Sequence, residues 1–265
     1  MKALSLILVL LATSFIFNQQ LIAENEIRTV GFQVDELTFE SSVVIPPTEK
    51  DLPGIFMVPN WLGNTEAAQA KAGRIAEMGF VVYVADVYTA EVRPEGPDEA
   101  GEVASALRAD RELMRQRLQA AFTHFQSLEE SLPVQSGQYG AIGFCFGGGA
   151  ILELARTGAP LQAFVSFHGD LASPTLESDS KNITGKVLVL HGADDPLVPV
   201  EDVLAFASAV REAGVDWQIN SYGGAVHSFT DPFADMTGVA EYNEVVAERA
   251  FAEMRRLFSE VFPSE

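Results

Sequence analysis

The sequence contains one cysteine, and its surroundings are typical of a nucleophile. Cys145 stands in the run Gly143-Phe-Cys145-Phe-Gly147, between the apolar segment Tyr139–Phe144 and a helix-like segment. Glycines two residues on either side of a nucleophile let a strand turn sharply into a helix, which exposes the nucleophile above the sheet. The helix N-terminus at such a turn favours the thiolate. The pattern predicts a catalytic cysteine rather than a buried structural one.

Two later loops could supply the base and the acid that such a nucleophile requires. His227 follows a predicted strand and a pair of glycines, and we expect it to be the base. Asp195 lies in a Gly-x-x-Asp-x-x-Val-Pro loop after another predicted strand, and we expect it to be the acid, with Asp194 as the alternative. The chain order of nucleophile, acid and histidine is the one that accompanies this turn. His168 also ends a predicted strand, which leaves open a supporting or pocket role.

An acyl-transfer site also needs donors for the oxyanion. One is expected from the backbone N–H of Phe146, directly after the nucleophile. The other is expected from the loop after the predicted strand Gly54–Pro59, where Asn60 and Trp61 stand, with the Trp61 N–H as the candidate.

Strand-like and helix-like segments alternate around these loops. The first two, Arg28–Val34 and Glu36–Ile45, predict an antiparallel N-terminal hairpin. Runs typical of buried parallel strands follow at Gly54–Pro59, Phe80–Ala85, Tyr139–Phe144, Ala163–Phe167, Lys186–Leu190 and Trp217–Tyr222. Helical patterns cover Thr65–Met78, Asp110–Leu128, Glu201–Ala213 and Ala240–Phe262. The alternation predicts an α/β fold, a mainly parallel sheet covered by helices on both faces, with ligands bound at the carboxyl ends of the strands.

The first 23 residues differ from the rest. Lys2 is followed by an apolar run from Ala3 to Phe17 and by Leu21-Ile22-Ala23, a pattern typical of a secretory signal peptide. The run is short for a bilayer crossing, which takes about 20 residues, so an uncleaved anchor is the less favoured alternative. We expect a periplasmic or secreted protein whose residues 24–265 form one domain, since no linker divides them.

Charge and composition exclude several classes of function. There are 17 Lys and Arg against 37 Asp and Glu, a net charge of −20, which becomes −21 without residues 1–23. So acidic a surface disfavours nucleic acid and anionic membranes as partners. The four histidines show no pair at metal-ligand spacing, so we expect no metal site. A small molecule is the expected partner, and the oligomeric state stays open.

From about Asp51 to Phe262 the chain resembles the dienelactone hydrolase family of α/β-hydrolases. The resemblance rests on the cysteine turn with its second glycine, Gly148, on the acid loop, and on Ala225-Val-His227-Ser-Phe229. Asp86-Val-Tyr88, after a predicted strand, also matches. It implies a single-domain, cofactor-free enzyme that cleaves esters or lactones through an acyl-cysteine, with Tyr88 bordering the pocket.

The sequence departs from the family at two places. Asn60 stands where the best-known members have a glutamate that keeps the resting cysteine protonated. The arginines that bind the anionic substrate of those members lack a clear match, since none follows His227 and Arg93 corresponds uncertainly. We therefore expect an uncharged or weakly charged substrate and direct activation of Cys145 by His227. The alternative is a non-catalytic binding protein that retains the scaffold. The segment Val87–Gly101 is expected to be a surface loop or a mobile cover of the site.

Overall fold

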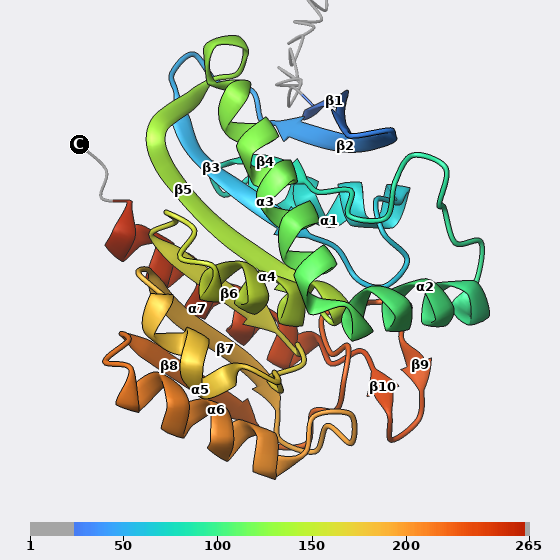
Figure 1. Ribbon diagram of the computed structural model, residues 1–265, viewed down its shortest axis with the longest axis vertical. Coiled ribbons are helices and arrows are strands. Elements are labelled where there is room, and N and C mark those ends of the chain that lie inside the picture. Colours follow the sequence, from blue (N-terminus) through green and yellow to red (C-terminus); the bar gives the residue numbers. More distant parts are fainter. Residues whose placement is uncertain (1–23, 263–265) are drawn as a thin grey trace, which may run out of the picture.

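The computed structural model describes residues 24–262, which are built on an eight-stranded sheet of order β1-β2-β4-β3-β5-β6-β7-β8 (Figure 1). The strands are β1 (Glu26–Val34), β2 (Leu37–Ile45), β3 (Leu52–Val58), β4 (Val81–Val84), β5 (Val134–Phe144), β6 (Ala163–Phe167), β7 (Lys186–Gly192) and β8 (Trp217–Tyr222). Neighbours from β4 to β8 run parallel, whereas β1 pairs with β2, and β2 with β4, in antiparallel fashion. The predicted parallel sheet with an N-terminal hairpin is confirmed. The predicted signal segment lies outside the described residues.

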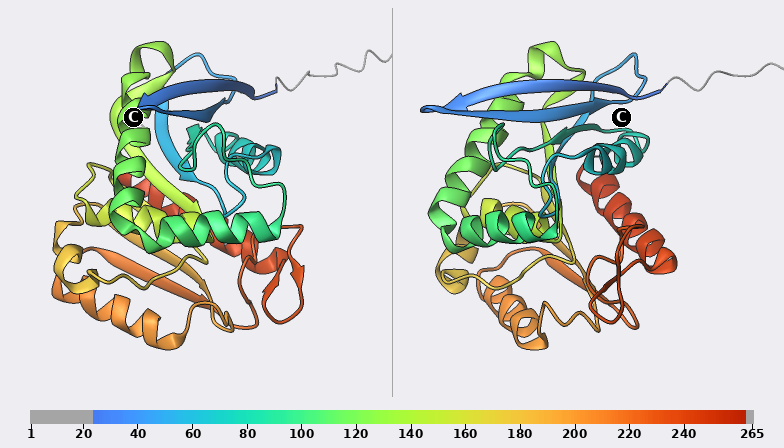
Figure 2. Two further views of the ribbon diagram at one scale, coloured as in Figure 1. Left: turned by 45° about the vertical axis from the view of Figure 1, so that its right-hand side comes forward. Right: turned by 90° about the vertical axis from the view of Figure 1, so that its right-hand side faces the viewer.

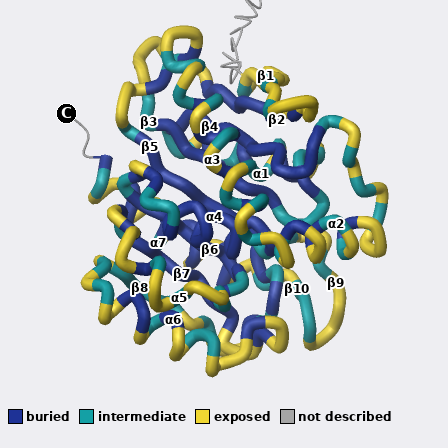
Figure 3. The backbone as a smooth tube through the Cα atoms, in the orientation of Figure 1, coloured by how far each residue is buried: buried dark blue, intermediate teal, exposed yellow. Residues whose placement is uncertain are grey.

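Helices cover both faces of the sheet, as Figure 2 shows in its right-hand view. They are α1 (Glu66–Ala76), α2 (Pro97–Ala109), α3 (Arg111–Ser127), α4 (Phe146–Arg156), the short α5 (Leu176–Asp179), α6 (Val200–Glu212) and α7 (Glu244–Val261). The apolar stripes of α1 and α7 pack against one face, and those of α2, α3, α4 and α6 belong to the core on the other. The central strands are accordingly buried over most of their length, and β5 is fully buried from Tyr139 to Phe144 (Figure 3). This packing fixes the strand ends at one edge, where the loops with polar residues emerge.

Two expectations about helices were wrong. The expected surface loop Val87–Gly101 already contains the start of α2 at Pro97, because a proline fits the first helical position and acids follow it in the first turn. The predicted helix from Ala240 begins only at Glu244, where the Asn243 side chain accepts the Val246 N–H at 3.2 Å and caps it. The residues before that cap form a small hairpin of β9 (Asp235–Met236) and β10 (Ala240–Glu241).

Within residues 24–262, no helix has the length and apolar character needed to cross a membrane. The same part of the chain holds no group of three His, Cys, Asp or Glu side chains arranged to bind a metal ion.

Candidate active site

Cys145 lies at the sharp turn between β5 and α4, at the carboxyl edge of the sheet. Its backbone has φ +55° and ψ −117°, a conformation that a residue with a side chain rarely adopts. The turn leaves no room for side chains at the two flanking glycines. A methyl group on Gly143 would lie 2.0 Å from the Gly147 carbonyl oxygen, and one on Gly147 would lie 2.1 Å from the Val58 carbonyl oxygen. The turn inferred from the glycine spacing therefore forms, and the thiol is partly exposed.

His168, the residue directly after the neighbouring strand β6, holds this turn. Its Nδ1 accepts the Cys145 N–H at 3.1 Å, which places the ring proton on Nε2, and Nε2 lies 2.8 Å from the Thr230 hydroxyl. Burial lowers the pKa of His168 well below its usual value, with the charges of His227 and Lys71 acting in the same direction. The ring therefore stays neutral, and it joins the turn at Cys145 to the loop that follows His227.

His227 and Asp195 meet above the ends of β7 and β8. The His227 Nδ1 lies 2.8 Å from Asp195 Oδ2, and both side chains are buried. Asp195 is held in turn by the Leu197 N–H, which donates to Oδ1 at 2.8 Å. Asp194 instead accepts the Gly224 N–H at 2.9 Å. The acid in contact with the histidine is thus Asp195 and not its neighbour.

The other ring nitrogen of His227 faces the cysteine. Nε2 is buried and pairs with no oxygen or nitrogen of residues 24–262. Burial alone would lower the pKa of His227, but the hydrogen bond to Asp195, the nearby Cys145 thiol and the charges of both groups raise it to about 10. The structure therefore brings Cys145, His227 and Asp195 together from three separate loops.

The loop after β3 lies against the turn at Cys145. The Asn60 side chain accepts the Leu62 N–H at 3.1 Å, and the buried Tyr88 donates its hydroxyl to the Trp61 carbonyl at 3.0 Å. No acceptor within the described residues pairs with the N–H groups of Trp61 or Phe146. Both donors are available for an oxyanion. Tyr88 anchors this loop and is not among the residues that line the adjacent pocket.

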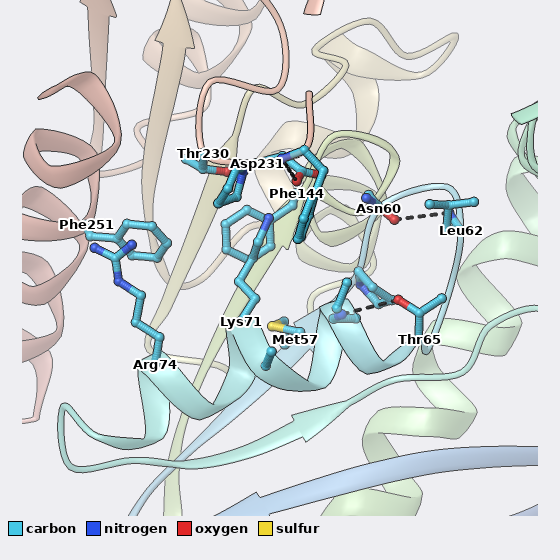
Figure 4. A pocket seen from close by; sticks show the side chains of 16 residues that line it. Met57, Asn60, Leu62, Thr65, Lys71, Arg74, Phe144, Thr230, Asp231 and Phe251 are labelled. Carbon is cyan, nitrogen blue, oxygen red and sulfur yellow. Dashed lines mark hydrogen bonds between the residues drawn. The ribbon is translucent and has the colours of Figure 1, made fainter. Parts of the chain in front are cut away.

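A pocket of about 480 Å³ opens beside these groups, between α1, α7 and the loop after His227 (Figure 4). Its walls are mainly apolar, and its polar side chains come from two segments that are far apart in the sequence. They are Asn60, Thr65, Lys71, Arg74, Thr230 and Asp231. Sequence reasoning did not predict Lys71. The available signal was a single cation on the apolar stripe of α1, three residues after Ala68 and four before Ile75.

Arg93, the uncertain match to a substrate-binding arginine, has another partner. Its Nη2 lies 2.9 Å from the carboxylate of the buried Asp86, and it is not part of the pocket wall. Asp86 also accepts the Tyr88 N–H at 3.0 Å. Arg93 therefore helps to fix the segment that carries Tyr88.

Comparisons with known proteins show the family of the chain. The sequence profile of the dienelactone hydrolase family matches residues 39–262. A Bradyrhizobium protein named "Probable 2-oxo-3-(5-oxofuran-2-ylidene)propanoate lactonase" is 26% identical over 209 residues, which cover 76% of this chain and 80% of that protein.

Two solved structures are similar over nearly their whole length. One, named m3DLH, is 35% identical with a TM-score of 0.81, and the match covers 91% of this chain and all of that one (100%). The other is a dienelactone hydrolase-like promiscuous phosphotriesterase from metagenomic libraries. It is 34% identical with a TM-score of 0.82, and the match covers 90% and 99% of the two chains.

Proposed function

Because the chain belongs to the dienelactone hydrolase family and is a hydrolase of ester or lactone bonds, we propose that it cleaves a carboxylic ester, thioester or lactone with Cys145, His227 and Asp195. The observation that carries this proposal is the His227 ring. Its Nδ1 is held by Asp195, while its buried Nε2 lies beside the strained cysteine. This is the arrangement of nucleophile, base and orienting acid.

In the first half of the reaction, the Cys145 thiolate attacks the carbonyl carbon and forms a carbon–sulfur bond. The carbonyl electron pair moves to the oxygen, which the N–H groups of Phe146 and Trp61 stabilise. When the carbonyl re-forms, the bond to the alcohol oxygen breaks. The His227 imidazolium gives its Nε2 proton to the leaving oxygen and becomes neutral.

In the second half, water attacks the thioester. Neutral His227 takes a proton from the water, the carbon–sulfur bond breaks, and the acid product leaves. The thiolate and the imidazolium are restored together. Asp195 keeps the Nδ1 proton in place throughout, so that Nε2 is the nitrogen that exchanges protons with substrate and water.

The resting state proposed here is a thiolate–imidazolium pair. Asn60 has no proton to exchange with the thiol, and its side-chain oxygen is already bonded to the Leu62 N–H. NMR of the His227 ring should show the imidazolium at neutral pH, because its pKa is raised to about 10. A His227 ring that is neutral at pH 7 would contradict direct activation by His227.

The function is tested by hydrolysis of short-chain aryl esters and lactones by the wild type, Cys145→Ala and Cys145→Ser. We expect the alanine variant to fall to the uncatalysed rate, and intact-mass measurement of the wild type to show an acyl adduct at Cys145. Equal rates for wild type and alanine variant would instead favour the non-catalytic binding protein. Full activity of the serine variant would show that sulfur is not required.

We also propose that Met1–Ala23 directs export to the periplasm or beyond and is then removed. The support is the charge and hydropathy pattern of those residues. Sequencing the N-terminus of the protein from the exported fraction tests this. A mature protein that still begins at Met1 would overturn the proposal.

A further inference from the structure

The pocket beside Cys145 holds a cation that the steps above do not use. Lys71 projects from α1 into this pocket, and its Nζ lies 4.4 Å from the centre of the Phe144 ring (Figure 4). Among residues 24–262 its ammonium group has no hydrogen-bond acceptor and no ion-pair partner. An ammonium group carries three donors, so Lys71 offers three donors to whatever occupies the pocket.

The other charged residues of the pocket wall are already engaged. Arg74 lies 2.7 Å from Glu248, and its guanidinium carbon lies 4.2 Å from the centre of the Phe251 ring. Asp231 accepts the Phe233 N–H at 3.1 Å. It acts on Lys71 only through its charge, from beyond ion-pair distance. Lys71 is thus the cation of this wall that has no acidic partner within ion-pair distance among the described residues.

Cys145, His227 and Asp195 do not line the pocket, but residues next to the reacting groups do. Phe144 precedes Cys145, Asn60 and Leu62 flank Trp61, and Thr230 is bonded to His168. Lys71 is also close enough to the nucleophile for the two charges to interact. Burial lowers the pKa of Lys71, and the charges of Asp231 and Cys145 oppose that change. A substrate whose carbonyl meets Cys145 can therefore extend into this pocket and reach Lys71.

The rest of the wall is apolar. It includes Met57, Leu62, Phe144, Pro232, Phe233 and Phe251. Such a wall favours an aliphatic or aromatic segment, whereas a partly buried ammonium without a partner favours an anion that restores its lost solvation. The two features lie in one cavity, so a single ligand with an apolar body and an anionic end satisfies both.

Resting on the proposed function, we propose that the substrate is a half-ester of a dicarboxylic acid: an apolar chain fills this pocket, and its free carboxylate binds Lys71. This differs from the uncharged substrate expected from the sequence, because the cation comes from α1 and not from the arginine positions of the family. In a protein with an excess of acids, Lys71 also provides the local positive charge that draws the carboxylate in.

The test compares aryl half-esters of dicarboxylic acids, from four to eight carbons, with neutral aryl esters of the same chain length. We expect one chain length at which the wild type has a kcat/KM about 10- to 100-fold higher for the half-ester, the range for a hydrogen bond to a charged group. In Lys71→Met this ratio should fall to about one, and in Lys71→Glu below one. Lys50→Met, which removes an exposed lysine away from the pocket, should keep the wild-type ratio.

The outcomes separate this inference from the proposed function. If the wild type has equal kcat/KM values for both series at every chain length while Cys145→Ala is inactive, the proposed hydrolase function is supported and the half-ester proposal fails. If the preference exists but survives in Lys71→Met, the carboxylate is bound elsewhere and the assignment to Lys71 fails. If the wild type and Cys145→Ala hydrolyse the esters at equal rates, the proposed function fails, and the half-ester proposal fails with it.

Discussion

The turn at Cys145 and the pocket beside it adjoin one another, but different kinds of groups form them. Backbone atoms form the turn: methyl groups on Gly143 and Gly147 would lie 2.0 and 2.1 Å from carbonyl oxygens of the chain itself. Side chains form the pocket, and they come from β3 and the loop after it, from α1, from β5 and from the segments after His227. The first region has no free space, whereas the second encloses about 480 Å³.

This difference separates two properties of the site. The reaction depends on a backbone path that tolerates almost no change, because its contacts are with groups that cannot move aside. Selectivity depends on side chains that can be exchanged one at a time without moving the thiol. Substitutions in the turn should therefore affect folding and activity together, and those of exposed side chains in the pocket wall should affect substrate preference alone.

The largest effect is expected from Gly147→Ala. The added methyl would lie 2.1 Å from the Val58 carbonyl oxygen and 2.4 Å from that of Pro59, so β3 and the loop with Trp61 must shift. We expect a loss of about 3 kcal/mol or more in the free energy of unfolding, measured by denaturant titration, with loss of activity. Gly223→Ala is the matched control, because a methyl there meets nothing within 4 Å. Equal stability of the two variants would show that the turn is not tightly packed.

The next effect is expected from Asp195→Asn, which should leave the fold intact and reduce kcat about 10³- to 10⁴-fold, because the His227 ring loses its orientation. The carboxylate helps to raise the pKa of His227 to about 10. Wild-type activity should therefore persist as pH rises and decline as the imidazolium deprotonates near pH 10. In the variant the pKa falls, so this decline should begin at lower pH.

Asp194→Asn is the control for that prediction. Asp194 bonds the Gly224 N–H and does not contact the histidine, so kcat and its pH profile should stay close to those of the wild type. A larger loss in Asp194→Asn than in Asp195→Asn would reverse the assignment of the acid.

The contrast also explains which parts of the site could be read from the sequence. The turn was predictable because its requirement is local: glycines at fixed offsets around Cys145 record a steric constraint within a few residues. Asp195 and His227 could be identified because parallel strands bring their carboxyl ends to one edge, so a polar residue after a strand already has an approximate position.

The pocket could not be predicted in this way. Lys71 reaches it only because α1 and α7, far apart in sequence, pack on the same face of the sheet. The tie from His168 to Thr230 likewise joins groups 62 residues apart. No local pattern encodes such contacts. The start of α2, in contrast, could have been predicted from the local sequence. Pro97 followed by acidic residues is a helix-start signal, but the segment was expected to be a loop.

An intermediate effect is expected where the two regions are joined. Thr230→Val keeps the shape of the side chain but removes the hydroxyl that faces His168 Nε2, which leaves a buried donor without a partner. We expect a loss of about 1–3 kcal/mol in unfolding free energy and a lower kcat, because His168 also accepts the Cys145 N–H. Thr230→Ser should restore both. A valine variant with wild-type stability and kcat would show that the tie has no effect.

The smallest effect is expected at the outer rim of the pocket. Phe233 lines the cavity but is 83% exposed, so its removal should change the free energy of unfolding by less than about 0.5 kcal/mol. A bound apolar chain would cover part of this ring, and burying a whole phenylalanine side chain is worth about 1.5–3 kcal/mol. Phe233→Ala should therefore raise KM for a medium-chain ester about fivefold and leave that for an acetyl ester unchanged. Leu204→Ala, at a 65% exposed position on α6 outside the pocket, should do neither. If the two variants behave alike, the substrate does not reach this rim, and its chain must lie deeper, against Phe144 and Lys71.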